Sequence, residues 1–216
     1  AFASVRDNDS DEETANANLI IDLVADVTNG TLVLANDGTF TYQGDLNFNG
    51  QDQFTYKIND GEDDSDPVTV TINVSAVNDA PVATFSTQQD VNEGSGMAPG
   101  QLTATDVDTG DEANLIFADT TGGIAGLTIN ADGSFMFDTS DAAYEDLDLG
   151  DISTINVTYS VTDPFTDVGN GAFDIVITGT NDAPVANFVD AQTVDEDAAA
   201  ITDSLTATDV DADDVP

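Results

Sequence analysis

The sequence has no cysteine, no histidine and no tryptophan among its 216 residues. Thiol and imidazole nucleophiles, imidazole general bases, zinc sites built on Cys or His, and disulfide cross-links are therefore excluded. Most catalytic arrangements depend on one of these groups, so we expect a protein that is not an enzyme. A secreted chain without disulfides needs another source of rigidity, and bound metal ions would provide it.

Positive charge is also scarce. Arg6 and Lys57 are the only cationic side chains beside 43 acidic ones, which gives a formal net charge of -41. Binding to nucleic acid or to an anionic membrane surface without a metal bridge is electrostatically excluded, and bound cations are the natural means of offsetting the repulsion. The chain is nevertheless 40% hydrophobic with 11 Phe, more than a disordered acidic tail carries, so we expect it to fold.

Long apolar runs are missing as well. No run approaches the roughly 18 to 20 residues that cross a bilayer, and no signal-peptide pattern opens the chain. We expect a soluble mature segment that does not insert directly into a membrane.

Internal repeats organise what is present. Val77–Ala83 recurs as Thr180–Ala186, and Leu102–Asp108 recurs as Leu205–Asp211, each time 103 positions later. Phe2–Asp9 is a weaker copy of the second motif, 99 positions before it. A period of about 100 residues is the size of one immunoglobulin-type sandwich.

Strand patterns fill each period. Short apolar runs flank Asn36–Gly38 and Ala131–Gly133, which is typical of hairpins because Asp-Gly tolerates positive φ. Only Asp141–Gly150 is expected to hold a short helical turn. The sequence therefore predicts an all-β fold of tandem Greek-key, immunoglobulin-like β-sandwiches. Four longer segments alternate apolar with polar residues, as half-buried strands do: 53–58, 68–74, 155–161 and 173–177.

The two Asn-Asp-Ala-Pro stretches mark domain boundaries. Proline lacks an amide donor and fixes φ, so it makes a short rigid linker. Residues 1–79 then form a repeat that lacks its opening strand, and residues 80–182 form a complete repeat. Residues 183–216 supply the opening strand or strands of a further repeat.

Acidic residues gather after a Thr-Ala-Thr-like strand in each copy. In an extended Asp-x-Asp the two carboxylates lie on one side about 6 to 7 Å apart, a span that one cation with oxygen ligands at about 2.3 to 2.6 Å bridges after modest bending. This favours calcium over magnesium and over soft metals. A solvated loop is the competing interpretation, and an EF-hand is rejected because Glu12 stands where it requires Gly. The clusters are Asp7, Asp9, Asp11 and Glu12; Asp106, Asp108 and Asp111; and Asp209, Asp211, Asp213 and Asp214.

These motifs resemble a known group. Leu102–Gly110 followed by Asn114–Phe117 resembles the "TATDxDxG…N…L" stretch of the cadherin repeat, and Val77–Val82 resembles its "VNDNAPVF" linker. The resemblance implies tandem cadherin-like β-sandwiches. A further resemblance, to the VCBS-type and related cadherin-like tandem repeats of large, RTX-adhesin-like bacterial surface adhesins, lies in residues 142–147, 157–163 and 29–60.

The resemblance implies calcium ions at the junctions, held by the base of one domain, the linker and the top of the next. For the first junction it implies the ligands Asn78, Asp79, Asp106, Asp108 and Asp163. For the second junction it implies Glu93, Asn181, Asp182, Asp209 and Asp211, and toward any preceding domain it implies Asp7, Asp9 and Asp60. The Asp-Arg-Glu ligand motif of cadherins has no counterpart in this sequence, so the number of ions per junction stays open. The candidate replacements for that motif are Glu145, Asp146 and Asp148.

We therefore expect a calcium-binding, extracellular structural or adhesin repeat that forms an extended fibre or stalk on a bacterial surface, in cell adhesion or a biofilm. Its partners would be neighbouring copies of the same repeat or subunit, or a surface glycan or protein. A glycan- or protein-binding module acting through loops at one end of the complete sandwich is an alternative. A glycosidase using Asp146 and Asp148 is disfavoured, because a small repeated sandwich offers no evident cleft.

A second alternative is a self-assembling filament subunit. Residues 183–214 would complete residues 1–79 of the next copy by donor-strand complementation. The competing interpretation is that the chain is a window on a much longer repetitive protein.

Overall fold

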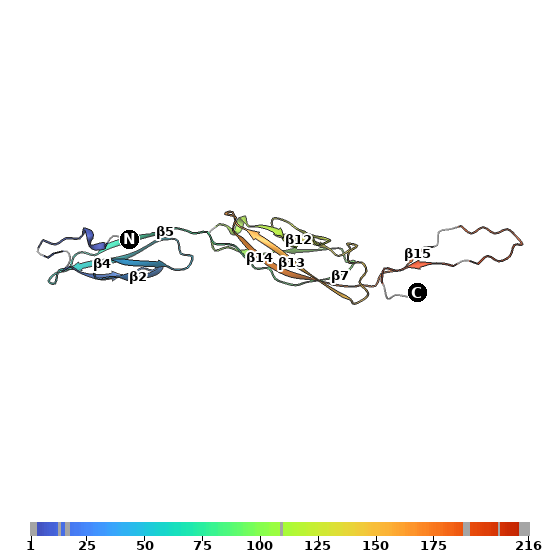
Figure 1. Ribbon diagram of the computed structural model, residues 1–216, viewed down its shortest axis with the longest axis horizontal. Helices are drawn as coiled ribbons and strands as arrows, with labels where there is room; N and C mark the ends of the chain where they lie inside the picture. Colours follow the sequence, from blue (N-terminus) through green and yellow to red (C-terminus); the bar gives the residue numbers. More distant parts are fainter. Residues whose placement is uncertain are drawn as a thin grey trace. The chain divides into compact units, whose positions relative to one another are not determined.

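The computed structural model describes residues 4–12, 14–15, 18–108, 110–187, 191–202 and 204–211, without the side chain of Asn8. The described residues form strands, turns and two short 3₁₀ segments, η1 (Val5–Asn8) and η3 (Glu112–Asn114), with no α-helix (Figure 1). The predicted all-β class is confirmed. Contacts divide the chain into two compact units, unit 1 (Ala1–Asn78) and unit 2 (Asp79–Pro216). No helix in these described ranges is long and apolar enough to cross a membrane.

Unit 1 is built from a sheet and a hairpin. The three-stranded antiparallel sheet has the order β1 (Ile20–Ala25), β4 (Gly50–Asn59) and β5 (Val68–Val74). The hairpin pairs β2 (Gly30–Leu34) with β3 (Phe40–Gly44). The central strand of the sheet, β4, supplies two of the four buried residues of the core, Phe54 and Tyr56.

The core of unit 1 centres on Phe54 and Tyr56 of β4, which are 0% and 3% exposed. The ring of Phe40, from the hairpin, packs edge-on against Phe54 with 5.2 Å between centroids. The hydroxyl of Tyr56 donates to the carbonyl of Val5 at 3.1 Å, which ties η1 to the sheet. Ser4 caps η1 by accepting from the backbone N–H of Arg6 and of the third helical residue.

Unit 2 contains two larger sheets. One has the order β10 (Ile116–Asp119), β13 (Ile152–Thr162), β14 (Val168–Thr178) and β7 (Gln89–Asn92), in which β7 runs parallel to β14. The other has the order β11 (Leu127–Ile129), β12 (Ser134–Asp138) and β8 (Met97–Gln101). Two small ladders complete the unit, β6 (Val82–Ala83) with β9 (Ala104–Thr105), and β15 (Val185–Ala186) with β16 (Ala207–Thr208).

The core of unit 2 joins residues from both larger sheets, so the sheets pack face to face as a sandwich (Figure 1). Alternation along the strands explains this, because every second residue of β13 and β14 points to the same face. The core residues are Leu102, Phe117, Phe135, Phe137, Tyr144, Val157, Tyr159, Val161, Phe173, Ile175 and Ile177.

The two expected hairpins form where the Asp-Gly pairs predict them. Gly38 connects β2 to β3 with φ of 82°, and Gly133 connects β11 to β12 with φ of 81°. A residue with a Cβ atom rarely adopts these φ values, which is the reason that glycine follows the aspartate in both turns.

The short helical turn expected in Asp141–Gly150 is not found. The segment is a series of turns. In two of them the backbone N–H of Tyr144 donates to the carbonyl of Asp141 at 2.9 Å, and the backbone N–H of Asp151 donates to the carbonyl of Asp148 at 2.9 Å. Tyr144 is buried and its hydroxyl donates to the carbonyl of Ala125 at 2.9 Å, so tertiary anchoring decides this conformation.

The predicted division of the chain after residues 79 and 182 stays a prediction.

Candidate metal site

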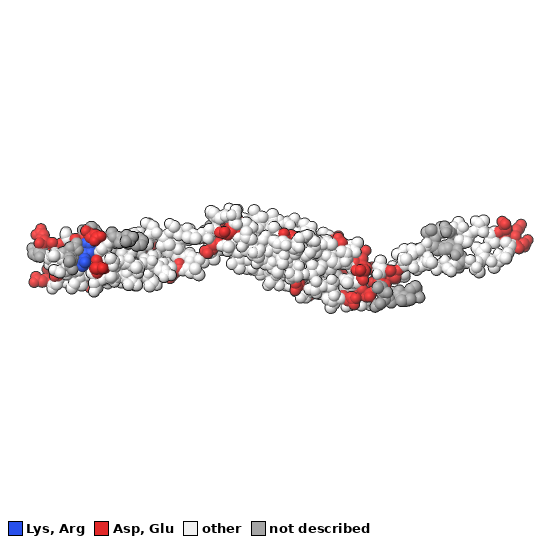
Figure 2. Space-filling model, viewed as in Figure 1, with Lys and Arg blue, Asp and Glu red and all other residues white. Residues whose placement is uncertain are grey.

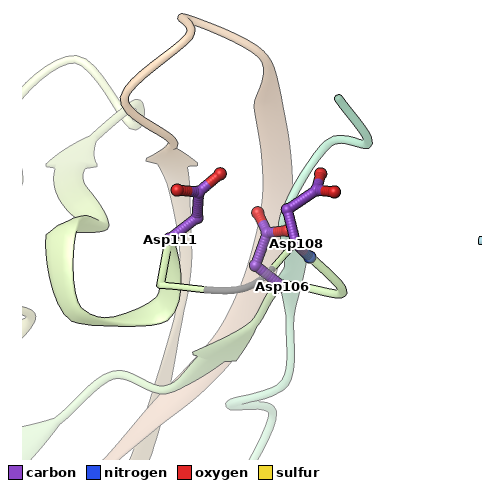
Figure 3. A group of neighbouring side chains, drawn as sticks. All are labelled: Asp106, Asp108 and Asp111. Atoms are coloured by element: carbon purple, nitrogen blue, oxygen red, sulfur yellow. The ribbon is translucent and has the colours of Figure 1, made fainter. Parts of the chain in front are cut away.

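The loop after β9 brings three carboxylates together in unit 2. The backbone N–H of Asp108 donates to a carboxylate oxygen of Asp106 at 2.9 Å, and the N–H of Asp111 donates to the carbonyl of Asp108 at 3.3 Å. These bonds curl the loop, so that one ligand atom from each of the three aspartates lies within 4.8 Å of the others. Figure 3 shows the three side chains rising from this one loop.

The three carboxylates are half-buried and poorly compensated. Oδ2 of Asp106 and Oδ2 of Asp111 are buried and accept no hydrogen bond from the residues that the structure describes. Burial raises the pKa of Asp111, and the charges of Asp106, Asp108 and Asp163 raise it further. Buried, uncompensated carboxylate oxygens this close together are the donor set that a hard cation such as calcium takes, with bonds of about 2.3 to 2.6 Å. The residues present therefore fit the ion.

Asp163 and Asp79 flank this cluster. Asp163 follows the end of β13 and is 3% exposed, and its Oδ1 accepts from the N–H groups of Phe165 at 2.8 Å and Asp167 at 2.9 Å. The backbone N–H of Asp79 donates to Oδ2 of Asp108 at 2.8 Å. The predicted linker residue is thus joined directly to a residue of the cluster.

The same arrangement recurs 103 residues later. The N–H of Asp182 donates to Oδ2 of Asp211 at 2.7 Å, and the N–H of Asp211 donates to Oδ1 of Asp209 at 3.2 Å. Oδ1 of Asp211 is buried and accepts no hydrogen bond from described residues. Asp214 is the counterpart of Asp111, and it lies outside the described residues together with Asp213.

Glu93 belongs to this second group through the linker backbone. Its side chain is 3% exposed, and it accepts from the N–H of Thr180 at 2.9 Å and from the N–H of Leu147 at 3.4 Å. Asn181, the next linker residue, is exposed, and its side-chain amide donates to the carbonyl of Asp182 at 2.6 Å. The contact with Leu147 places the segment of Glu145, Asp146 and Asp148 beside Glu93, and their replacement of the missing motif stays a prediction.

The predicted ligands of unit 1 have protein partners in this structure. Asp7 accepts from the N–H of Ser4 at 3.2 Å, and Asp9 accepts from the hydroxyl of Tyr56 at 3.2 Å. Asp60 accepts from two backbone N–H groups of its own turn, which lower its pKa. Among the described residues of unit 1 no three acidic side chains meet as Asp106, Asp108 and Asp111 do. Metal binding by Asp7, Asp9, Asp60 and Asn78 stays a prediction.

The only two cationic side chains of the sequence both lie in unit 1 (Figure 2). Lys57 forms a salt bridge with Asp64 at 2.6 Å. Arg6 donates to the carbonyls of Leu19 at 3.2 Å and Asn36 at 3.4 Å. Unit 2 has no Lys or Arg in its sequence, so the charge of its aspartates is not offset by any side chain of that unit.

Sequence reasoning missed one member of the cluster as a ligand. Asp111 stood in the Asp106 cluster, and the ligand set implied by resemblance left it out. Its spacing, Asp-x-Asp-x-x-Asp, was the available signal, because a turn after the second aspartate returns the third to the same side of the loop.

Comparisons with known proteins agree with this architecture. Residues 1–76 match the model of the bacterial cadherin-like domain, so the first unit is a domain of that kind. The family found is a cadherin-like one, and no enzyme family was found. No curated protein matches the chain.

Solved structures of cadherin repeats share the fold. Mouse cadherin-23 EC22–24 aligns with a TM-score of 0.60 and 20% identity over 93% of this chain and 68% of that one. Human CDH23 EC21–23 aligns with a TM-score of 0.59 and 16% identity over 91% of this chain and 75% of that one. The protocadherin gammaB4 extracellular domain aligns with a TM-score of 0.52 and 19% identity over 91% of this chain, which spans 35% of that structure.

Proposed function

We propose that this chain, whose first unit is a bacterial cadherin-like domain, is a calcium-rigidified extracellular structural or adhesin repeat. It would act as a segment of an extended fibre or stalk on a bacterial surface. The observation that supports this most directly is the cluster of Asp106, Asp108 and Asp111, with two buried carboxylate oxygens that accept no hydrogen bond from described residues.

Rigidity follows from where the clusters lie. The Asp-x-Asp loops accept hydrogen bonds from the linker residues Asp79 and Asp182, so an ion that orders a loop also orders the linker joined to it. Without the ion, the aspartates repel one another and each buried oxygen loses the hydration it would have in water. Calcium supplies the missing positive charge and couples its binding to order in the linker.

Calorimetric titration of the metal-free full chain with calcium tests the proposal. We expect binding with dissociation constants of about 10⁻⁴ to 10⁻³ M or tighter, the range of extracellular calcium modules. Asp106→Asn removes a ligand without changing shape, so it should abolish part of the binding. Asp90→Asn is the matched control, because Asp90 is an exposed aspartate of β7 outside the cluster.

Small-angle scattering of the same samples reports on rigidity. Calcium should reduce the flexibility of the full chain, and Asp106→Asn should weaken that response while Asp90→Asn keeps it. Unchanged scattering on saturation with calcium, or equal calcium binding by both variants, would contradict the proposal.

A further inference from the structure

A groove of about 420 Å³ lies on unit 2, lined by none of the aspartates of the metal cluster. One part of its lining is residues 101–104, which join β8 to β9, and another is η3 with the start of β10. Asp132, in the turn between β11 and β12, completes the lining. The volume falls within the roughly 300 to 1,000 Å³ of small-molecule sites. The structure describes every residue that lines this groove, and all of them belong to unit 2.

The floor of the groove is apolar. Leu102 and Phe117 line it and are also core residues, 2% and 8% exposed. Leu115, between η3 and β10, is half-buried and packs against the same core. Because these side chains are buried and yet line the groove, they form its floor. A concave apolar floor favours a ligand with an aliphatic part, since docking removes apolar surface of both from water.

Three side chains that line the groove end in acceptor oxygens. The N–H and the hydroxyl of Ser134 both donate to Oδ1 of Asp132, so Oδ2 accepts no hydrogen bond from the described residues. Glu112 is exposed, and its carboxylate has no partner within the described ranges. The amide of Gln101 donates to the carbonyls of Leu102 at 3.1 Å and Asp132 at 2.9 Å, which leaves its oxygen as an acceptor. The groove therefore offers acceptors and negative charge.

Hydrogen bonds hold the walls of the groove in place. The carbonyl of Thr103 accepts from the N–H groups of Thr84 at 2.9 Å and Phe85 at 3.2 Å. The N–H of Phe117 donates to the carbonyl of Ala131 at 3.0 Å, which joins β10 to the turn of Asp132. A ligand does not have to order these walls when it binds, and this reduces the entropic cost of docking.

The chain itself supplies no cation for this groove. Unit 2 has no Lys or Arg in its sequence, and both cations of unit 1 are already engaged there. Lys57 forms its salt bridge with Asp64, and Arg6 donates to two backbone carbonyls. A second copy has the same two cations in the same contacts. The complementary charge therefore has to come from a different molecule.

We propose that the groove docks a lysine side chain of a partner protein. The aliphatic stem of the lysine lies on the apolar floor, and its ammonium group donates to the oxygens of Gln101, Glu112 and Asp132. Lysine fits this combination because a flexible apolar stem ends in a cation that only donates hydrogen bonds. Lysine docking does not depend on calcium binding, because none of these side chains belongs to the metal cluster.

Nuclear magnetic resonance titration of the isotopically labelled full chain tests the proposal. The probe is the peptide acetyl-Gly-Lys-Gly-amide, and calcium is kept in excess so that it competes with the peptide at the aspartate clusters. We expect the largest chemical-shift changes at the backbone amides of Ala113, Leu115 and Phe117. The dissociation constant should lie in the millimolar range, because a single side chain makes few contacts.

Glu112→Gln should weaken binding of the peptide roughly two- to fivefold, which is the contribution of an exposed ion pair. Glu62→Gln is the matched control, because it removes the same charge from an exposed residue of unit 1, and it should leave the affinity unchanged. A peptide with norleucine in place of lysine keeps the stem without the charge and should not bind measurably. Equal weakening by the two substitutions, equal binding of the two peptides, or shift changes spread over all the acidic loops would overturn the proposal.

The same spectra distinguish a partner protein from a second copy. If the shifts of the groove residues change with the concentration of the chain alone, a second copy occupies the groove and the proposal is wrong. Calcium titration of Glu112→Gln keeps the result separate from the proposed function, because we expect this variant to bind calcium as the native chain does. Loss of calcium binding would place Glu112 in the metal site and overturn its assignment to the groove.

Discussion

The backbone N–H of Asp182 donates to a carboxylate of Asp211 at 2.7 Å, and the N–H of Asp79 donates to Asp108 at 2.8 Å. In both cases a residue of an Asn-Asp-Ala-Pro linker is joined to the second aspartate of an Asp-x-Asp loop 29 residues later. The two copies of the sequence motif therefore form the same hydrogen bond, and this bond orders both linkers.

Because the two loops are alike, we expect each to bind calcium independently. Asp108→Asn should remove the calcium bound at the first loop only, and Asp211→Asn the calcium bound at the second only. The double variant should lose the calcium bound at both loops. Equilibrium dialysis with radioactive calcium measures the stoichiometry, and loss of all binding in either single variant would show that the loops are one coupled site.

We expect Asp111→Asn to stabilise unit 2 without calcium and to remove the stabilisation that calcium gives. Burial and the neighbouring carboxylates raise the pKa of Asp111, so ionisation of this group favours the unfolded chain. Its contribution to stability is present below the unfolded pKa of about 3.9 and is lost as the pH rises through the higher folded value. Urea unfolding at pH 7 with and without calcium measures both effects.

Asp132→Asn is the control for that experiment. Hydrogen bonds from the hydroxyl and the N–H of Ser134 lower the pKa of Asp132, so its ionised form is favoured by folding. We expect this variant to be slightly destabilised, with its response to calcium intact. If Asp111→Asn and Asp132→Asn shift the free energy of unfolding in the same direction, repulsion among the carboxylates around Asp111 does not explain the result.

Asp52 of β4 should make stability depend on pH in the opposite sense. Burial raises its pKa, but the N–H groups of Thr28, Asn29 and Gln53 and the hydroxyl of Tyr42 outweigh burial and lower the pKa to about 2. The stability that Asp52 contributes is therefore present above the unfolded pKa of about 3.9 and is lost as the pH falls toward 2.

Asp52→Asn isolates this contribution. The difference in unfolding free energy between the native chain and the variant should be constant from pH 7 to about pH 5 and shrink below pH 4. Chemical unfolding at a series of pH values checks the window. A difference that grows on acidification would contradict the hydrogen-bond explanation.

Gly100→Ala should destabilise unit 2 by about 1 to 3 kcal/mol, because overpacking a well-packed site has costs of this size. The ring of Phe135 lies over Gly100, and an added Cβ would meet three of its ring atoms. Gly44→Ala is the control, because a Cβ there comes no closer than 3.5 Å to the Tyr42 hydroxyl. Thermal unfolding should separate the two variants, and equal melting temperatures would refute the packing argument.

Local signals in the sequence predict the hairpins and the central strands. The Asp-Gly pairs require positive φ at Gly38 and Gly133, and alternation of apolar residues marks β4, β13 and β14 because one face of each is buried. The Asp-x-Asp spacing likewise predicts the position of the Asp106 cluster. These features depend on residues that are close in the chain.

Strands β7 and β8 had no such signal. Their sequences, Gln-Asp-Val-Asn and Met-Ala-Pro-Gly-Gln, lack alternation, and Pro99 argues against a central strand. They form because the outer edges of β14 and β12 present unpaired backbone groups and apolar rings. The pairing is fixed by distant partners, from Ser134 with Gln101, which are 33 residues apart, to Ile175 with Gln89, which are 86 apart, and no local pattern records this.

The position of both cationic side chains in unit 1 limits where proteases can cleave the chain. Proteases that cleave after lysine or arginine have two candidate bonds in the whole chain, after Arg6 and after Lys57. Arg6 donates to the carbonyls of Leu19 and Asn36, and Lys57 lies within β4, so folding restricts access to both. Residues 58–216 offer such a protease no bond at all, whether that part of the chain is folded or unfolded.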